Sequence, residues 1–483
     1  MRQTALRCCA CSEQSHREMM PPLLGILLSV ALPWVLGAGA IHALARRVPH
    51  GGLLAIGYGY LLGAFVVTLL MRAESLAGMH WTFAGVAGPI ALLALVAGWL
   101  GRPRRARDAT VVGTRTSLAT ASPFARAIFW TVLVVLVARG VGLALEVFYR
   151  PVQPWDAWSH WATKAKVWYA YGRMLPFVQP GEWLRDGALL AFTDQQPGYP
   201  ATVPLLQVWT TLWLPGWNDA WMNAPWPVLF ASLGCAAFAQ ARRAGIEMVA
   251  AMVYTWLLLS LPFLEVHVAL AGLADVFLAA AFGLCVMALA LALERRQRID
   301  ILLAVAMAVT VITIKLEGAL WLVTLLPALV AAYRRRLALW LAGISAAVVV
   351  LYLAFGPAEL RIFGYVLRTA FTNVSLPVLQ HMFVMDNWHL FWYAVLGIVL
   401  LRGRTLLQPG VAPLTLAMLA GIAFIAVVFF FSSAAGGVDD ETLVNRLLLQ
   451  IIPALSFYAL WLLRGPPARE QAILTSAGAS AHG

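Results

Sequence analysis

Charged residues are scarce in this sequence: Asp, Glu, Lys and Arg make up only 12% of its 483 residues. Soluble domains carry about 25% charged residues, so this low share excludes an ordinary soluble protein. Hydrophobic residues reach 61%, and the mean hydropathy is +0.80. Apolar runs of about 17–25 residues recur along nearly the whole chain, and each can cross the hydrocarbon layer of a bilayer. The composition therefore predicts an all-α polytopic membrane protein.

Cysteine is also scarce, with five residues in the whole chain. Cys8, Cys9 and Cys11 lie in a polar N-terminal tail, and Cys235 and Cys285 lie inside apolar runs. No pair has the spacing of a zinc site or of a disulfide framework. We therefore assign no metal ligands from the sequence.

The formal net charge of +12 could indicate a nucleic-acid partner, but the basic residues are grouped in short loops between apolar runs. Such loops face the cytoplasm in inner-membrane proteins, and no nucleic-acid partner is expected. The topology described next places all of these loops on one side, which predicts a multi-pass bacterial inner-membrane protein with a cytoplasmic C-terminus. The loops are Arg46-Arg47, 102–107, Arg242-Arg243, 294–298, 334–336 and 402–404.

The apolar runs predict about 13 transmembrane helices. Segment 200–216, "PATVPLLQVWTTLWLPG", is short and flanked by proline, and we predict that it is an interfacial helix lying along the membrane. The alternative, a further span, would reverse the orientation of everything after it and scatter the basic loops over both sides. The predicted spans are 22–45, 52–71, 80–100, 126–148, 220–241, 247–263, 272–293, 299–314, 317–333, 337–356, 386–402, 411–432 and 446–463.

The first residues differ in composition from the rest of the chain. Residues 1–21 form a mostly polar tail whose arginines fall on the outer side, against the charge rule, and a start codon assigned too far upstream would explain this. The next apolar run is too long for a signal peptide and is predicted to be the first span. The remaining chain divides into a three-helix membrane module (22–125), a transmembrane core (126–464) with a large outer loop (149–219), and a cytoplasmic tail (465–483).

Ionisable residues gather on the side opposite the basic loops. Asp275, Lys315, Glu317 and Arg446 lie at or within apolar runs, where a charge is costly and normally faces a cavity. We predict that they line a shared polar cavity, together with Tyr199, His160 and His267. A plainer alternative is that they pair with one another, for example Lys315 with Glu317 or Asp275, and hold helices together.

The outer loop opens with the aromatic stretch "DAWSHWATKAKVWYAYG". The spacing of Trp158, Trp161 and Trp168 predicts one side of a helix lying at headgroup level. Lys164 and Lys166 lie off that side, where they could meet anionic headgroups or a lipid phosphate, or serve as ordinary interface anchors.

Asp156 begins the same stretch, directly after Pro154-Trp155 and just beyond a predicted span. From there its carboxylate could reach the cavity, or it could cap the helix, with Ser159 completing the turn. His160 lies four residues further on the same helical face. It could line the cavity or be a hydrogen-bonded histidine of the interface.

Five motifs, in this order along the chain, carry a resemblance: "WDAWSHWATKAK", "DQQPGYPATVPLLQ", "GLADVFLA", "IKLEG" and "NRLLLQIIPAL". Over residues 126–463 the sequence resembles the GT-C superfamily of membrane glycosyltransferases. It is most similar to bacterial members related to protein O-mannosyltransferases and the lipid A aminoarabinose transferase. The resemblance implies an inverting transferase that takes a sugar from a polyprenyl phosphate and whose first-loop aspartate, here Asp156, is catalytic. Many members carry a second acidic residue beside the first, where this chain has Ala157, so their paired-carboxylate metal site is not expected.

Such a reaction predicts a role for each candidate residue. Asp156 would be the base that takes the proton of the acceptor hydroxyl. Lys315 and Arg446, with Lys164 or Lys166, would hold the leaving phosphate. The sugar and acceptor cavity would be lined by His160, Tyr199, His267, Asp275 and Glu317. No cofactor is assigned, and a divalent cation is left open.

The expected partners are the lipid bilayer, a polyprenyl-phosphate-linked sugar donor, and a glycan, lipid or protein acceptor at the outer (periplasmic) face. Two other classes would also use charged residues in a membrane protein of this kind. One is a lipid-linked glycan flippase or another transporter, although no internal repeat of the kind common in transporters is evident. The other is a polysaccharide polymerase or ligase.

Overall fold

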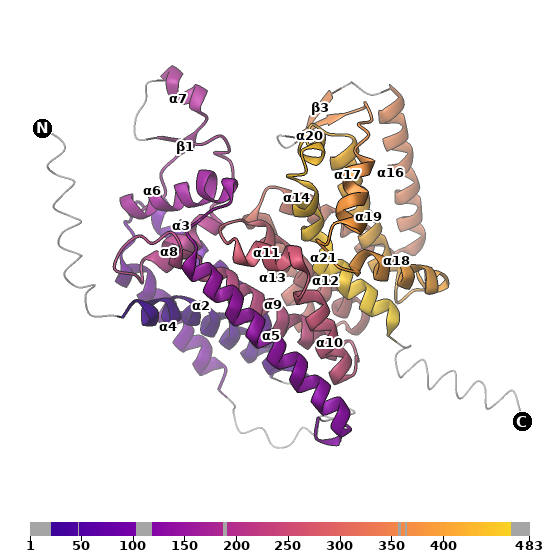
Figure 1. Cartoon of the computed structure of the whole chain (residues 1–483), viewed down its shortest axis with the longest axis horizontal. Coiled ribbons are helices and arrows are strands. Elements are labelled where there is room, and N and C mark those ends of the chain that lie inside the picture. Colours follow the sequence, from indigo (N-terminus) through magenta and orange to yellow (C-terminus); the bar gives the residue numbers. More distant parts are fainter. Residues whose placement is uncertain are drawn as a thin grey trace, which may run out of the picture.

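A computed structural model describes residues 21–46, 48–102, 118–186, 191–355, 359–362 and 365–464. The predicted C-terminal tail and all but the last residue of the predicted N-terminal tail lie outside these residues. Most of the described chain is helical, as Figure 1 shows. The strands within it form only two small sheets, a parallel pair of β1 (Phe177–Val178) with β2 (Phe192–Thr193) and an antiparallel pair of β3 (Glu359–Ile362) with β4 (Tyr365–Arg368). The predicted all-α class is thus confirmed.

Eight helices in the described residues are long and apolar enough to cross a membrane, or nine if one bent pair is a single span. The bent pair, α10 (Met248–Leu259) with α11 (Pro262–Ala269), turns by 63°. Pro262 explains the break, because proline cannot donate the hydrogen bond that would continue α10 but suits the first turn of a new helix. The eight are α2 (Pro22–Ala45), α3 (Gly51–Leu76), α4 (Phe83–Leu100), α5 (Pro123–Tyr149), Trp221–Arg243 containing α9 (Pro225–Arg243), α12 (Asp275–Arg295), α19 (Ala412–Phe430) and α21 (Val444–Leu463).

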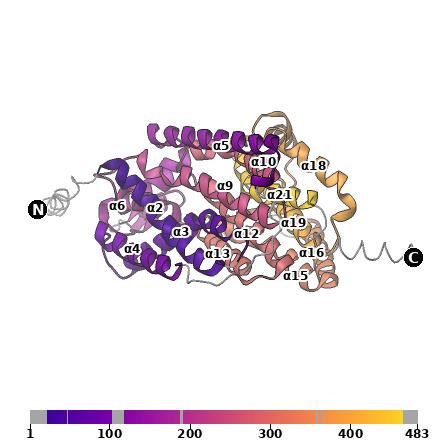
Figure 2. The ribbon, with the colours of Figure 1, turned by 90° about the horizontal axis from the view of Figure 1, so that it is seen from below.

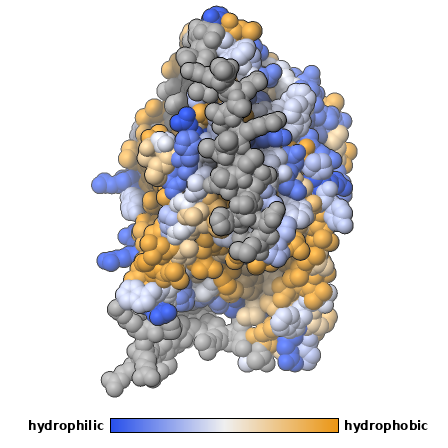
Figure 3. All heavy atoms as spheres, turned by 90° about the vertical axis from the view of Figure 1, so that its left-hand side faces the viewer, coloured by the Kyte–Doolittle hydropathy of each residue, from blue (hydrophilic) through white to orange (hydrophobic). Residues whose placement is uncertain are grey.

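The other predicted spans also fold as helices but are not among these eight. They correspond to α13 (Arg298–Ile314), α14 (Glu317–Val323) with α15 (Leu326–Tyr333), α16 (Arg335–Phe355) and α18 (Phe391–Leu401). The count of about 13 therefore stays a prediction. That the chain is a multi-pass membrane protein is supported further by Figure 3, where a hydrophobic band lies between more hydrophilic zones.

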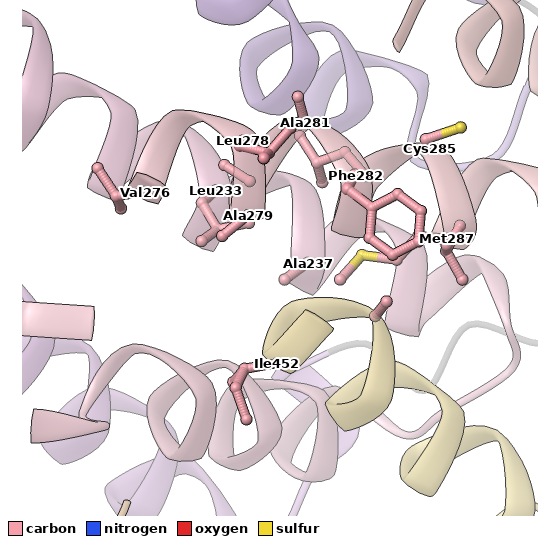
Figure 4. Packing of buried hydrophobic residues seen from close by; sticks show 14 of the residues in the cluster. Leu233, Ala237, Val276, Leu278, Ala279, Ala281, Phe282, Cys285, Met287 and Ile452 are labelled. Carbon is pink, nitrogen blue, oxygen red and sulfur yellow. The ribbon is translucent and has the colours of Figure 1, made fainter. Parts of the chain in front are cut away.

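Helix α12 is the centre of the structure. It lies in the middle of the bundle, with α2, α3 and α4 at one end and α15, α16 and α18 at the other (Figure 2). Its central residues, including Ala279 and Phe282, are fully buried against neighbouring helices (Figure 4). A side chain at Gly283 would meet Pro453 of α21 at 2.4 Å, so this glycine is what lets the two helices approach closely. Helix α12 therefore packs closely against the middle of α21.

Loop 149–219 folds over the side of the bundle that is uppermost in Figure 1. We name this side the loop end. It contains a π-helix (Ala157–Ala162), α6 (Thr163–Tyr171), α7 (Pro180–Asp186) and α8 (Thr202–Thr211). Strand β3 and helix α20 (Ala435–Asp439) lie at the same end in Figure 1. The segments between α16 and α18 include α17 (Ser375–Leu379) and a second π-helix (Gln380–Val384).

The two segments predicted to lie at the membrane interface are largely buried in the protein. All ten residues of α8, which is shorter than the predicted segment 200–216, are buried. Trp161 and Trp168 are also buried, whereas Trp158 is 45% exposed. The predicted single tryptophan face is therefore wrong, because a π-helical turn, with its i→i+5 hydrogen bonds, replaces the α-helical spacing at this point. An interfacial position for α8 stays a prediction.

Candidate functional site

Five charged side chains from distant parts of the chain meet at the loop end. Asp156 precedes the π-helix, Asp275 begins α12, Lys315 follows α13, Glu317 begins α14, and Arg446 is in the first turn of α21. We name these five residues the charge cluster. The structure thus brings together the residues that the sequence placed in apolar runs, and adds Asp156 to them.

Arg446 joins the two aspartates. Its Nη1 atom donates to Asp156 Oδ2 at 2.6 Å, while Nε and Nη2 donate to Asp275 Oδ2 at 3.1 and 3.0 Å. The guanidinium group presents its donors in a planar fork, which is why one side chain can bind two carboxylates in different directions. A lysine at this position lacks the planar fork and could not bind both carboxylates in the same way.

Asp275 is the buried centre of the charge cluster, with 1% of its side chain exposed. Its Oδ1 atom accepts hydrogen bonds from Lys315 Nζ at 2.9 Å and from Gln450 Nε2 at 3.0 Å. Trp321 orients that amide by donating to Gln450 Oε1 at 2.6 Å. A carboxylate buried this deeply requires such compensation, so Asp275 fixes both cations of the charge cluster.

Lys315 also lies 3.4 Å from Glu317 Oε1. The pairing that the sequence offered as the plainer alternative is therefore present. It does not account for the exposure of the charge cluster, because Asp156 and Arg446 each keep 24% of the side chain exposed, and Glu317 18%. A molecule at the loop end would meet these three residues first, with Asp275 and Lys315 behind them.

Tyr199 and His267 lie beside the charge cluster. Burial raises the pKa of the Tyr199 phenol, and the charges of Lys315, which lowers it, and of Glu317, which raises it, act on it from nearby. The Tyr199 ring stacks on Trp161 with centroids 4.9 Å apart. His267, from α11, lies near the charge of Asp275. It is buried, and its Nε2 atom has no hydrogen-bond partner within the described structure.

His160 and Lys164 belong to a second cluster. Both contact Asp194, His160 Nδ1 at 2.5 Å from Oδ1 and Lys164 Nζ at 2.8 Å from Oδ2. The Lys164 ammonium also donates to the backbone oxygens of Gln196 at 2.7 Å and Pro197 at 3.4 Å. Because its side chain is 1% exposed, makes two hydrogen bonds and pairs with Asp194, Lys164 is not available to a phosphate in this structure.

Lys166 is exposed and lies 5.8 Å from the ring centroid of Trp217. Neither predicted loop lysine therefore joins the charge cluster, and His160 does not join it either. The second cluster instead fastens the π-helix that follows Asp156 to the segment that carries Tyr199.

The capping alternative for Asp156 is wrong. Its side chain makes no capping hydrogen bond at the start of the helix, because the carboxylate turns toward Arg446. Ser159 does not complete a cap either, since its buried hydroxyl has no partner among the described residues.

In the described part of the chain, no group of three or more His, Cys, Asp or Glu side chains is arranged to hold a metal ion.

The sequence did not single out Gln450. It lies four residues after Arg446, on the same face of α21, and that spacing is the signal that could have found it. Trp321 could not be found this way, because its contact with Gln450 joins residues far apart in sequence.

Asp194 gives the protein a predicted dependence of stability on pH. Burial opposes ionisation, but the bonds from Lys164 and from the Gln196 N–H outweigh it and lower the pKa of the carboxyl below 3.8. The folded carboxyl holds its proton less tightly than the unfolded one. The ionised carboxylate therefore stabilises the fold at pH values above the unfolded pKa. This contribution is lost as the pH falls through the lower, folded pKa.

We expect Asp194→Asn to lower the melting temperature at neutral pH and to flatten its decline on acidification below about pH 4. The measurement is thermal unfolding in detergent as a function of pH. The control is Asp386→Asn, whose carboxyl is 79% exposed and, among the described residues, pairs only with an exposed histidine. Parallel curves for wild type and Asp194→Asn would contradict the assignment.

The chain matches no protein-family model, no curated protein and no solved structure.

Proposed function

We propose that the protein is a glycosyltransferase that moves a sugar from a polyprenyl-phosphate donor to an acceptor hydroxyl, with inversion. The observation that supports this most is the single arginine, Arg446, that binds the exposed Asp156 and the buried Asp275 together. A base and a phosphate-binding cation are thereby adjacent at one end of a helical membrane bundle. The active site would lie on the outer (periplasmic) face of the bacterial inner membrane, with the C-terminus in the cytoplasm.

In the proposed reaction, Asp156 takes the proton of the acceptor hydroxyl. The acceptor oxygen forms a bond to the anomeric carbon from the side opposite the phosphate, while the bond between that carbon and the phosphate oxygen breaks. The bonding electrons pass to the phosphate oxygen, so the lipid phosphate gains one negative charge. Lys315 and Arg446 would stabilise that charge, because preorganised cations act most strongly where charge develops.

The shared arginine couples donor binding to the base. If the donor phosphate takes the Nη1 N–H that Arg446 now donates to Asp156, it displaces that carboxylate. Asp275 would keep the guanidinium in place through Nε and Nη2 during this exchange. Asp156 would then be free to accept a proton only when the donor phosphate is bound, which would limit loss of the sugar to water.

The position of the charge cluster favours transfer over transport. Asp275 is the first residue of α12, and Arg446 is the third residue of α21. Transporters place their substrate sites near the membrane midplane, often at broken helices. Here the charges lie at helix ends, where an acceptor in the aqueous phase could reach a lipid headgroup.

A vesicle assay tests the function. The purified protein would be reconstituted with host membrane lipids, acceptor-containing membranes and a panel of polyprenyl-phosphate hexoses and pentoses labelled in the sugar. We expect label from one donor to leave the lipid and appear in a glycan, lipid or protein product of the cell envelope. Label that stays on the lipid but crosses to the other leaflet, as measured by access to membrane-impermeant periodate, would indicate a flippase instead.

A further inference from the structure

Arg72 is a partly buried cation at the loop end, outside the charge cluster. It lies in α3, four residues or about 6 Å before the helix ends at Leu76. This end of α3 is fixed to loop 149–219, because Trp81 donates its backbone N–H to the Gly172 oxygen and its indole N–H to the Met71 oxygen. Arg72 therefore lies near the level at which the helix leaves the membrane.

The guanidinium group of Arg72 uses few of its donors inside the protein. Nη2 donates to Thr202 Oγ1 at 2.8 Å, while Nε is buried and has no partner among the described residues. No carboxylate of the described chain acts on the Arg72 charge. Glu74 is close in sequence, but residues two apart on a helix point in different directions. Among the described residues, Arg72 is thus a cation without a counter-ion.

A partly buried cation with an unsatisfied N–H is unfavourable unless an anion accompanies it. The planar fork of arginine suits the oxygens of a phosphate group, which can accept two of its N–H groups at once. Leu76, close to the end of α3, is 90% exposed, as expected for a surface covered by lipid. A lipid phosphate at that surface has the chemistry needed to act as the counter-ion of Arg72.

Thr202 connects Arg72 to the charge cluster. Its hydroxyl accepts from Arg72 and donates to the backbone oxygen of Thr313 at 2.6 Å. Thr313 is two residues before Lys315, and Thr202 is three residues after Tyr199. A phosphate on Arg72 would therefore be held by the same segments that carry residues of the candidate site.

We propose that Arg72, with Thr202, forms a binding site for the phosphate group of a membrane lipid. The N-terminal helices would thereby contribute a ligand contact to the transmembrane core. The phosphate could come from a polyprenyl monophosphate or from a bilayer phospholipid, which share this chemistry. Only the identification of that lipid as the sugar donor rests on the proposed function.

Native mass spectrometry of the full chain in detergent micelles tests the site. Polyprenyl monophosphate, phosphatidylglycerol and the phosphate-free alcohol polyprenol would each be titrated onto wild type and variants. We expect Arg72→Met to weaken binding of at least one phosphate lipid by about tenfold to a hundredfold, with Arg72→Lys intermediate. Binding of polyprenol should not change.

The control is Arg150→Met, which removes an exposed arginine just after α5 at the loop end, and it should change binding by less than about twofold. Preference for polyprenyl monophosphate or for phosphatidylglycerol supports the site and identifies the source of the phosphate. Equal binding of polyprenol and polyprenyl monophosphate by the wild type would overturn the proposal, as would unchanged binding in folded Arg72→Met.

If Arg72→Met does not fold, Arg72→Lys and the comparison of lipids on the wild type still decide the matter. Sugar transfer is not measured in this experiment. Failure of the transferase assignment would therefore leave these binding ratios intact, and loss of the Arg72 site would not by itself contradict the transferase.

Discussion

Asp156→Asn is expected to abolish sugar transfer, lowering its rate by about 10²–10⁴, the usual contribution of a general base. Asparagine has nearly the same size and can still accept a hydrogen bond from Arg446, but it cannot take a proton from the acceptor. The side chain is 24% exposed, so the substitution should leave the fold intact. The measurement is the initial rate of label transfer in the vesicle assay, with expression level and melting temperature determined in parallel.

The effect on the donor should separate this role from a purely structural one. Because Arg446 loses its ion pair with Asp156, the donor phosphate should bind Asp156→Asn at least as tightly as it binds wild type, and the loss should fall on kcat. Asp386→Asn is the control, since its carboxyl is exposed and, within the described structure, pairs only with His389 at 2.8 Å. Near-normal transfer by folded Asp156→Asn would exclude Asp156 as the base.

The helices could be predicted from the sequence because their signal is local. Long apolar runs gave the spans near the N-terminus closely, with 126–148 predicted against an observed Pro123–Tyr149. Ser122 and Pro123 explain the earlier start, since the Ser122 hydroxyl accepts from the Ala125 N–H and proline fits the first turn. The bend at Pro262 and the π-helix after Asp156 depend on tertiary packing as well, and hydropathy does not reveal them.

The charge cluster could be predicted in part for a physical reason. A charged residue in an apolar run is stable only if it pairs with another charge or faces a cavity. Asp275, Lys315 and Arg446 were therefore expected to contact one another or a shared cavity. Lys164 shows the limit of this reasoning. Its partner Asp194 is 30 residues away and meets it only because the loop folds back, and no local pattern predicts such a contact. The sequence therefore identified the charges next to apolar helices more reliably than those in the loop.

Asp275→Asn is expected to cause the largest loss of stability of any single change in the charge cluster. It leaves Lys315 and Arg446 without the carboxylate that both now bind, and removing one partner of a buried ion pair typically costs about 3–5 kcal/mol. The expected result is a clearly lower melting temperature and yield, together with loss of transfer. Glu317→Gln is the matched control, because Glu317 is more exposed and its contact with Lys315 is longer, at 3.4 Å.

A double variant separates the charge effect from ordinary damage to packing. Lys315→Met removes one of the two cations that Asp275→Asn leaves uncompensated, so the double variant should be less destabilised than the sum of the two single variants. The expected coupling is on the order of 0.5–3 kcal/mol, the range found for residues in direct contact, and it is measured from denaturant unfolding of all four proteins. Simple additivity would mean that Asp275 does not hold Lys315, and the buried centre of the charge cluster would have to be assigned to other contacts.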